Sequence, residues 1–264
     1  MCSARLATSK LGQGAEVEAA SLGLVAAAAL LAGFTQAFAG FGSTLVAMPL
    51  LALVLGVRAA VPLGCLMALS INVLLVARLG RQAHGLSLVL LLAAALPGMV
   101  LGFLFQSTAP EALLKFLLGS CVVVLALRLS GRGAHRYPLG RRWAVAAGIA
   151  SGCMGVSLGI NGPPVVSWAV CQTWSRDTLK ATLTAYFLCA GSLIVAMQFW
   201  QGLMNNQVLA LFAKTLPLLL AGMCAGWMCC DRVSESAFRR VVLALLATTG
   251  LALLWQALGQ AIPA

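Results

Sequence analysis

The stretch SLGINGPPVVSW, residues 157–168, interrupts one of the longest apolar runs in the sequence. The apolar residues WAVAAGIASGCMGV precede it, yet two glycines, an asparagine and two adjacent prolines stand in its middle. Inside a bilayer, a backbone N–H or C=O group that loses its helical partner finds no water to replace it, which costs several kcal/mol. The stretch therefore predicts a membrane helix that breaks at a defined point.

The composition indicates an integral membrane protein. Of the 264 residues, 61% are hydrophobic and 9% are charged, whereas soluble domains carry about 25% charged residues. The apolar runs are long and rich in Leu, Ala and Val, which is typical of helices and not of barrel strands. We therefore expect an all-α polytopic membrane protein whose principal partner is the lipid bilayer.

The net charge of +11 does not indicate nucleic-acid binding, because Lys and Arg lie in short loops between the apolar runs, as in cytoplasmic loops of membrane proteins. The nine cysteines form no C-x-x-C motif, and no H-E-x-x-H or phosphate-loop motif occurs. We therefore expect no metal site, no cofactor, no catalytic residue and no ATPase within the chain.

Two of the apolar runs are too long to cross a bilayer once. The eight runs fall at residues 21–57, 60–79, 86–106, 112–129, 143–173, 179–200, 207–228 and 238–259. As one helix the first run would extend roughly 55 Å, against a hydrocarbon core of about 30 Å. The first and fifth runs must therefore fold back or tilt severely.

The two long runs resemble each other. With a shift of 119 residues, GFTQAFAGFGSTLVAMP at 33–49 overlies GCMGVSLGINGPPVVSW at 152–168. With a shift of 120, Pro97 and Gly102 fall on Pro217 and Gly222. This pattern indicates a duplication: a tail at 1–20, a first half at 21–130, a basic cytoplasmic linker at 131–142 and a second half at 143–264. Each half begins with a long broken or re-entrant helix and continues with three spans.

Loop charges favour an inverted arrangement of the halves. The linker contains Arg132, Arg136, Arg141 and Arg142 and no acid, which places it in the cytoplasm. If residues 143–173 cross once, the Arg-rich loop 231–240 lies outside. If they enter and return as a hairpin, that loop lies inside and the second half is upside down, as in many transporters. Eight plain spans with parallel halves are the alternative.

The breaks have the residues of helix ends. Gly159 can end a helix with positive φ, Asn161 can cap the next helix, and Pro163 suits a first turn. In the first half, Gly40 and Gly42 break the helix and Ser43 or Thr44 caps. A helix N-terminus carries free N–H groups and about half a positive charge, which makes an anion site. The predicted substrate-binding residues are Gly40, Gly42, Ser43, Thr44, Gly159, Asn161, Gly162 and Pro163. Close helix packing through small residues is the alternative.

Other intramembrane polar groups have simpler interpretations. No carboxylate lies within a span, so the usual proton relay is missing. An anion leaving the cell gains about 2.3 kcal/mol per 100 mV of membrane potential, which could drive export. Lys214 either extends to the membrane surface or attracts the anion. Gln36, Asn72, Gln198 and Tyr186 are expected to join or pack helices.

GFTQAFAGFGSTLVAMPLL and GCMGVSLGINGPPVVSW, at the start of two four-segment halves, resemble the TauE/SafE sulfite and organosulfonate exporter family. The family often has a glycine triplet after the first break, where Ser43 here takes the third place. The resemblance implies a multi-pass carrier in the bacterial inner membrane, and no enzyme, that exports a small anion such as sulfite or sulfoacetate. A permease subunit of a multi-component transporter and a carrier for an unrelated small solute are the alternatives.

Overall fold

The computed structural model describes residues 22–38, 40, 42–79, 83–130, 139–229 and 235–261. The predicted tail at 1–20 and most of the predicted linker at 131–142 lie outside the described residues. Within the described ranges every regular element is a helix and none is a strand. The all-helical class predicted from the composition is therefore confirmed.

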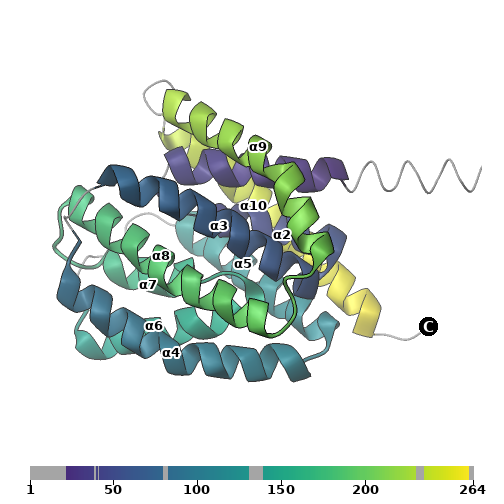
Figure 1. The fold of residues 1–264 in the computed structure, drawn as a ribbon, viewed down its shortest axis with the longest axis horizontal. Helices are drawn as coiled ribbons and strands as arrows, with labels where there is room; N and C mark the ends of the chain where they lie inside the picture. The colour runs from purple at the N-terminus through teal and green to yellow at the C-terminus, as the bar shows by residue number, and fades with distance from the viewer. Residues whose placement is uncertain are drawn as a thin grey trace, which may run out of the picture.

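Each long apolar run forms two helices. The first consists of the helix Leu22–Phe38 and α2 (Ser43–Leu55), and the fifth consists of α6 (Arg141–Leu158) and α7 (Gly162–Ala169). The remaining helices are α3 (Val57–Leu79), α4 (Gly85–Thr108), α5 (Glu111–Ser130), α8 (Arg176–Trp200), α9 (Asn206–Cys229) and α10 (Glu235–Ala261). Figure 1 shows them as one bundle in which α3 runs beside α8.

Within the described part of the chain, five helices are long and apolar enough to cross a membrane: Val57–Val76, Gly85–Thr108, Asp177–Trp200, Asn206–Cys229 and Arg240–Gln260. In α3, 56% of the most apolar window is buried, against 28% in α9 and in α10. The outer helices thus turn apolar side chains outward, and Trp200 and Trp255 are 94% and 80% exposed. Such an apolar exterior suits lipid and supports a polytopic membrane protein.

Two pairs of helices approach each other closely at glycines. A Cβ atom added to Gly152 in α6 would lie 2.2 Å from the carbonyl oxygen of Ala95 in α4. A Cβ atom added to Gly33 would lie 2.1 Å from the carbonyl oxygen of Leu219 in α9. Only glycine permits such contact between two helix backbones. The first helix of each half therefore packs against a helix of the other half.

These contacts repeat along both helix pairs. A Cβ atom added to Gly98 would lie 2.1 Å from the carbonyl oxygen of Ile149 in α6. A Cβ atom added to Gly222 would lie 2.1 Å from the carbonyl oxygen of Leu30. In these contacts the residues of the first helix and of α6 are 119 apart, and those of α4 and α9 are 124 apart. The predicted shift of 120 residues between α4 and α9 therefore differs by four residues, about one helical turn, from the separation that the contacts give.

Contacts also fix the direction of each helix. Contacting residue numbers rise together in the pair α4 and α6, and in the pair Leu22–Phe38 and α9, so each pair is parallel. The N–H of His84 donates to Oγ1 of Thr182 at 2.8 Å, which places the starts of α4 and α8 together. The Arg58 side chain donates to the Ala109 carbonyl at 2.8 Å, so α3 begins where α4 ends.

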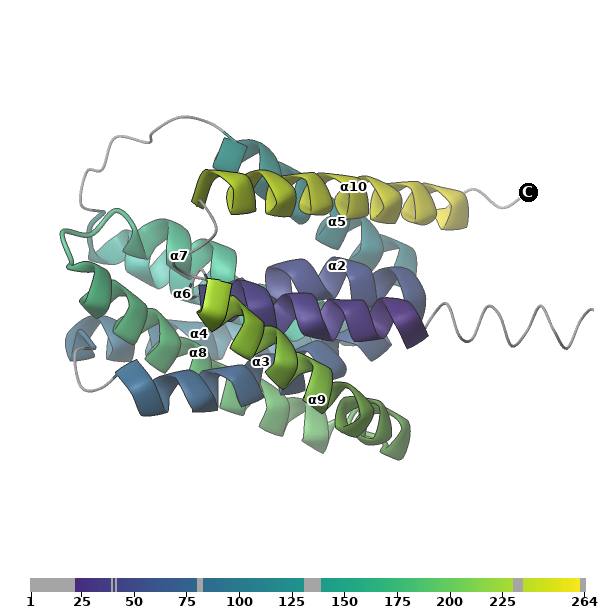
Figure 2. The ribbon, with the colours of Figure 1, turned by 90° about the horizontal axis from the view of Figure 1, so that it is seen from above.

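The bundle thus has two distinct ends, as Figures 1 and 2 show. Helices α4, α6, α8 and α10 begin at one end. We call it the basic end, because the helix termini there carry or adjoin Arg128, Arg141, Arg142, Lys180 and Arg240. Helices α3, α5, α9 and Leu22–Phe38 begin at the opposite end. At the basic end, Trp168 and Gln172 donate to the Leu139 carbonyl at 3.2 and 3.1 Å. The segment of α6 and α7 therefore starts and finishes at the same end.

Candidate functional site

The second interruption lies between α6 and α7. Gly159 ends α6 in the left-handed region at φ 70°, and its N–H bonds to the Met154 carbonyl. The prediction that Gly159 ends the helix with positive φ is therefore confirmed. Helix α7 begins at Gly162, one residue before Pro163. Asn161 holds the N-cap position, but its side chain makes no capping bond.

The expectation that Asn161 caps α7 was therefore wrong. A capping side chain accepts a hydrogen bond from the N–H of the second or third helical residue. In α7 these residues are Pro163 and Pro164, which have no N–H. The prolines that start the helix also remove the donors that a cap would satisfy.

The first interruption lies between Phe38 and Ser43. Gly42 is the N-cap of α2 with φ 102°, and Gly40 also has positive φ, at 83°. Ser43 and Thr44, one of which we expected to cap, are instead the first two residues of the helix. The capping role falls to Gln36, whose Oε1 accepts from the Ser43 N–H at 2.9 Å.

Gln36 connects this break to a third helix. Its Nε2 donates to Oδ1 of Asn72 in α3 at 3.2 Å, and the two side chains are only 2% and 3% exposed. Both amide oxygen and amide nitrogen of Gln36 thus have partners, as a buried polar group requires. The prediction that Gln36 and Asn72 join helices is confirmed.

The second break is supported by a hydroxyl chain. The Tyr186 hydroxyl donates to Ser151 Oγ at 2.8 Å, and the Ser151 hydroxyl donates to the Asn161 carbonyl oxygen. Tyr186 is fully buried. Besides packing, as predicted, Tyr186 thus helps to satisfy a carbonyl group in the interrupted segment.

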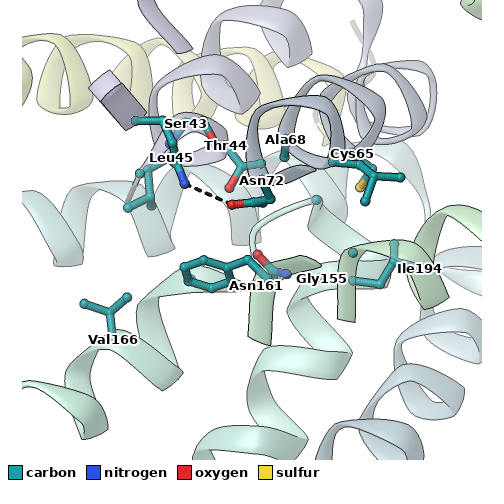
Figure 3. A pocket seen from close by; sticks show the side chains of 17 residues that line it. Ser43, Thr44, Leu45, Cys65, Ala68, Asn72, Gly155, Asn161, Val166 and Ile194 are labelled. Carbon is teal, nitrogen blue, oxygen red and sulfur yellow. Dashed lines mark hydrogen bonds between the residues drawn. The ribbon is translucent and has the colours of Figure 1, made fainter. Parts of the chain in front are cut away.

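The two breaks line one small cavity of about 30 Å³, which has room for about two water molecules. Figure 3 shows Ser43, Thr44 and Asn72 on one side of it and Asn161 on the other. The lining comprises Gln36, Gly42, Ser43, Thr44, Leu45, Cys65, Ala68, Leu69, Asn72, Gly155, Gly159, Asn161, Gly162, Val166, Phe187, Gly191 and Ile194. We call it the central cavity.

Six of the eight predicted site residues therefore meet at the central cavity: Gly42, Ser43, Thr44, Gly159, Asn161 and Gly162. The other two do not line it. Gly40 lies beside the aliphatic part of Lys180, whose Cε is 3.5 Å from a Cβ added to the glycine. Pro163 lies in the first turn of α7, outside the lining.

Twelve of the lining residues can be paired between the two predicted halves. At an offset of 119, Gln36 corresponds to Gly155, Gly42 to Asn161 and Ser43 to Gly162. At an offset of 122, residues of α3 correspond to residues of α8, and the pairs are Cys65 with Phe187, Leu69 with Gly191 and Asn72 with Ile194. Sequence reasoning missed most residues of α3 and α8, because the repeat was followed only through the long runs and one later span.

The chemistry of the central cavity is neutral and mainly hydrogen-bonding. Among the residues that the structure places, none of its lining side chains is charged. The side chains of Ser43, Thr44 and Asn161 make no hydrogen bond with any described residue. The first-turn amides of α2 have no partner within that helix. The cavity can therefore donate hydrogen bonds to a small solute without fixing it by a full charge.

The remaining predicted polar residues lie elsewhere. Lys214 is exposed on α9 and does not line the central cavity, which favours extension to the membrane surface over attraction of a bound anion. Gln198 is fully buried and its Nε2 contacts Sγ of Cys65 at 3.7 Å. It therefore joins α8 to α3, as predicted, behind the lining residue Cys65.

Comparison with protein-family models matches residues 25–253 to the family described as Sulfite exporter TauE/SafE. Comparisons with curated proteins and with solved structures gave no match. The matched region spans both interruptions and all the residues that line the central cavity.

Proposed function

The chain belongs to the sulfite exporter TauE/SafE family, and on this premise we propose that it exports a small anion through the central cavity. Membership of a family of membrane transporters makes it a transport protein. The single observation that carries the rest is that both helix interruptions contribute to one cavity of hydrogen-bond donors. Membrane transporters commonly bind substrate where discontinuous helices of two repeats meet.

We further propose that the two halves are inverted repeats, each opening with a re-entrant hairpin. Two observations support this. The matched glycine contacts relate the halves by near-constant offsets. The segment α6–α7 starts at the basic end, whereas Leu22–Phe38 begins at the opposite end and runs parallel to α9. Two hairpins that enter from opposite faces would bring their breaks together near the middle of the bilayer.

The basic end is proposed to face the cytoplasm of a bacterial cell, with the protein in the inner membrane. The positive-inside rule supports this orientation, because Arg and Lys concentrate near membrane-flanking segments on the cytoplasmic side. The opposite end has Arg58 and Lys115 but also Glu111. On this reading substrate enters the central cavity from the basic end and leaves at the opposite end.

The substrate is proposed to be a small oxyanion, with sulfite as the first choice. The small volume of the central cavity favours an inorganic ion over a larger organosulfonate. The hydroxyls of Ser43 and Thr44, the Asn161 amide and the α2 amides would replace part of its hydration shell. A site without a fixed cation binds weakly enough to release the ion on the other side, which transport requires.

The proposed driving force is the membrane potential. No carboxylate or histidine lies among the lining residues that the structure describes, so a proton relay there has no carboxylate or imidazole to carry the proton. Each negative charge that leaves a cell gains about 2.3 kcal/mol per 100 mV. Export of a monovalent anion could thus proceed without ATP.

Purified protein in liposomes tests this proposal. We expect accumulation of radiolabelled sulfite under an imposed potential that is positive on the far side of the membrane, and slow flux when valinomycin and equal potassium clamp the potential to zero. Gly162→Leu should abolish flux, because the new side chain would occupy the central cavity next to Phe187.

Transport by the purified chain alone would exclude the permease-subunit alternative, since no ATPase is present. A panel that includes sulfite, sulfoacetate and an uncharged solute of similar size separates anion carriage from carriage of an unrelated solute. Equal flux of the uncharged solute, or unchanged sulfite flux in inserted Gly162→Leu protein, would contradict the proposal.

A further inference from the structure

A second cavity opens at the end of the bundle opposite the basic end. It has a volume of about 310 Å³ and is lined by Arg58, Phe103, Gln106, Ser107, Gln201 and Leu203. These residues belong to the start of α3, the end of α4 and the turn after α8. We call it the vestibule. Its volume lies at the lower limit of cavities that hold small organic ligands.

The vestibule contains polar atoms that the protein leaves unsatisfied. Gln106 is only 4% exposed, yet neither its Nε2 nor its Oε1 has a hydrogen-bond partner among the described residues, and Nε2 of Gln201 also has none. Leaving a buried donor or acceptor unpaired costs about 1–3 kcal/mol. Two such glutamines beside one cavity therefore indicate a ligand that completes their hydrogen bonds.

The charge of the vestibule favours an anion. Among the described residues that line the vestibule, only Arg58 has a charged side chain. One guanidinium nitrogen, Nη2, donates to the Ala109 carbonyl at 2.8 Å, which fixes the direction of the side chain. Its other N–H groups can face an oxyanion, for which a guanidinium is well suited.

The nearest carboxylate does not compete for this arginine. Glu111 accepts from the N–H of Val57 at the start of α3 and does not line the vestibule. That contact places a negative charge at a helix N-terminus, which is favourable. The neighbouring Arg58 thus makes no ion pair with a described carboxylate.

We infer that the vestibule is a second binding site, specific for an oxyanion with several oxygen atoms. Arg58 and the amide nitrogens of Gln106 and Gln201 donate to its oxygens, while Oε1 of Gln106 accepts from a protonated oxygen or from water. The inference does not depend on the central cavity. In a transporter this site would receive an anion that leaves the bundle, or hold the head group of an anionic lipid.

Equilibrium dialysis of the full-length purified protein against ³⁵S-labelled inorganic sulfate tests the site. We expect saturable binding by the wild type. Arg58→Gln and Gln106→Glu should each weaken sulfate binding at least tenfold, because one removes the cation and the other places a carboxylate beside the anion. Lys214→Gln removes an exposed positive charge outside both cavities and should leave binding within twofold of the wild type.

Gln106→Leu provides a second readout. If Gln106 serves a ligand, this variant should lose sulfate affinity at least fivefold even where its unfolding temperature rises. Unchanged affinity in Gln106→Leu and Arg58→Gln, an equal loss in Lys214→Gln, or the absence of saturable binding by the wild type would each overturn the inference. Thr44→Pro, which alters the central cavity alone, should retain sulfate binding, so that failure of the proposed transport is separable from failure of this site.

The source of the oxyanion is decided in the same experiment. Displacement of sulfate by micelle-bound phosphatidylglycerol, but not by phosphatidylcholine, would assign the vestibule to a lipid head group. Displacement by free sulfite without an effect of either lipid would assign it to the transported ion.

Discussion

The two helix interruptions share a backbone plan but differ in chemistry. At the first, Ser43 and Thr44 follow Gly42, and buried Gln36 and Asn72 connect the break to α3. At the second, Gly162, Pro163 and Pro164 follow Asn161, and the positions that correspond to Gln36 and Asn72 are Gly155 and Ile194. The first break is therefore rich in donors, whereas the second is nearly without them.

This difference suggests that the two predicted halves have different roles at the central cavity. The prolines fix the backbone at the start of α7, but they supply no N–H group. The Ser43 N–H bonds to Gln36, whereas the Thr44 N–H and the hydroxyls of Ser43 and Thr44 make no hydrogen bond with a described residue. In this account the first half binds the anion, and the second half closes the cavity and contributes one amide side chain.

The largest effect is expected where the halves remain alike. Gly33→Val and Gly152→Val would each drive a side chain into the carbonyl oxygen of a neighbouring helix, 2.1 or 2.2 Å from the added Cβ. Both variants should lose most folded protein in detergent size-exclusion profiles, and to a similar extent. Gly23→Ala, which meets nothing within 4 Å, is the matched control. Loss in only one of the two valine variants would break the proposed equivalence of the halves.

A smaller effect is expected where the halves differ. Asn72→Leu leaves Nε2 of Gln36 buried without an acceptor, which should cost about 1–3 kcal/mol and misplace the cap of α2. We expect a lower unfolding temperature and about tenfold slower sulfite flux in liposomes. Ile194→Leu, at the corresponding position of the second half, should change either quantity little. Equal losses in the two variants would show that the polar network has no special role.

The sequence was sufficient to locate both interruptions, and six of the eight residues predicted there line one cavity. Gly159, Gly42 and the adjacent prolines are strong local signals because they restrict or permit particular backbone angles. The contacts of Gly33 and Gly152, which are 119 residues apart, are alike, since each meets the carbonyl oxygen of a neighbouring helix. These features depend on a few neighbouring residues, so they can be read without the fold.

Other features depended on contacts between distant residues. Gln36 caps a helix that begins seven residues later, and this requires the chain to turn back between them. The separation of 124 between the contact residues of α4 and α9 is set by which helix backbones touch. The vestibule joins residues of α3, α4 and the turn after α8, which no local motif brings together.

The claim that the first break holds the anion is tested most directly by exchanging one residue type between the two breaks. Thr44 corresponds to Pro163 at the offset of 119, so Thr44→Pro removes one N–H and one hydroxyl while keeping a residue that suits a first helical turn. Thr44→Val keeps the N–H and removes only the hydroxyl. The measurement is the initial rate of potential-driven sulfite flux into liposomes by these variants and by Pro163→Thr.

The account predicts at least tenfold slower flux for Thr44→Pro, an intermediate rate for Thr44→Val, and at least half of the wild-type rate for Pro163→Thr. Wild-type flux in correctly inserted Thr44→Pro protein, or a loss in Pro163→Thr as large as in Thr44→Pro, would contradict the claim that the first break holds the anion.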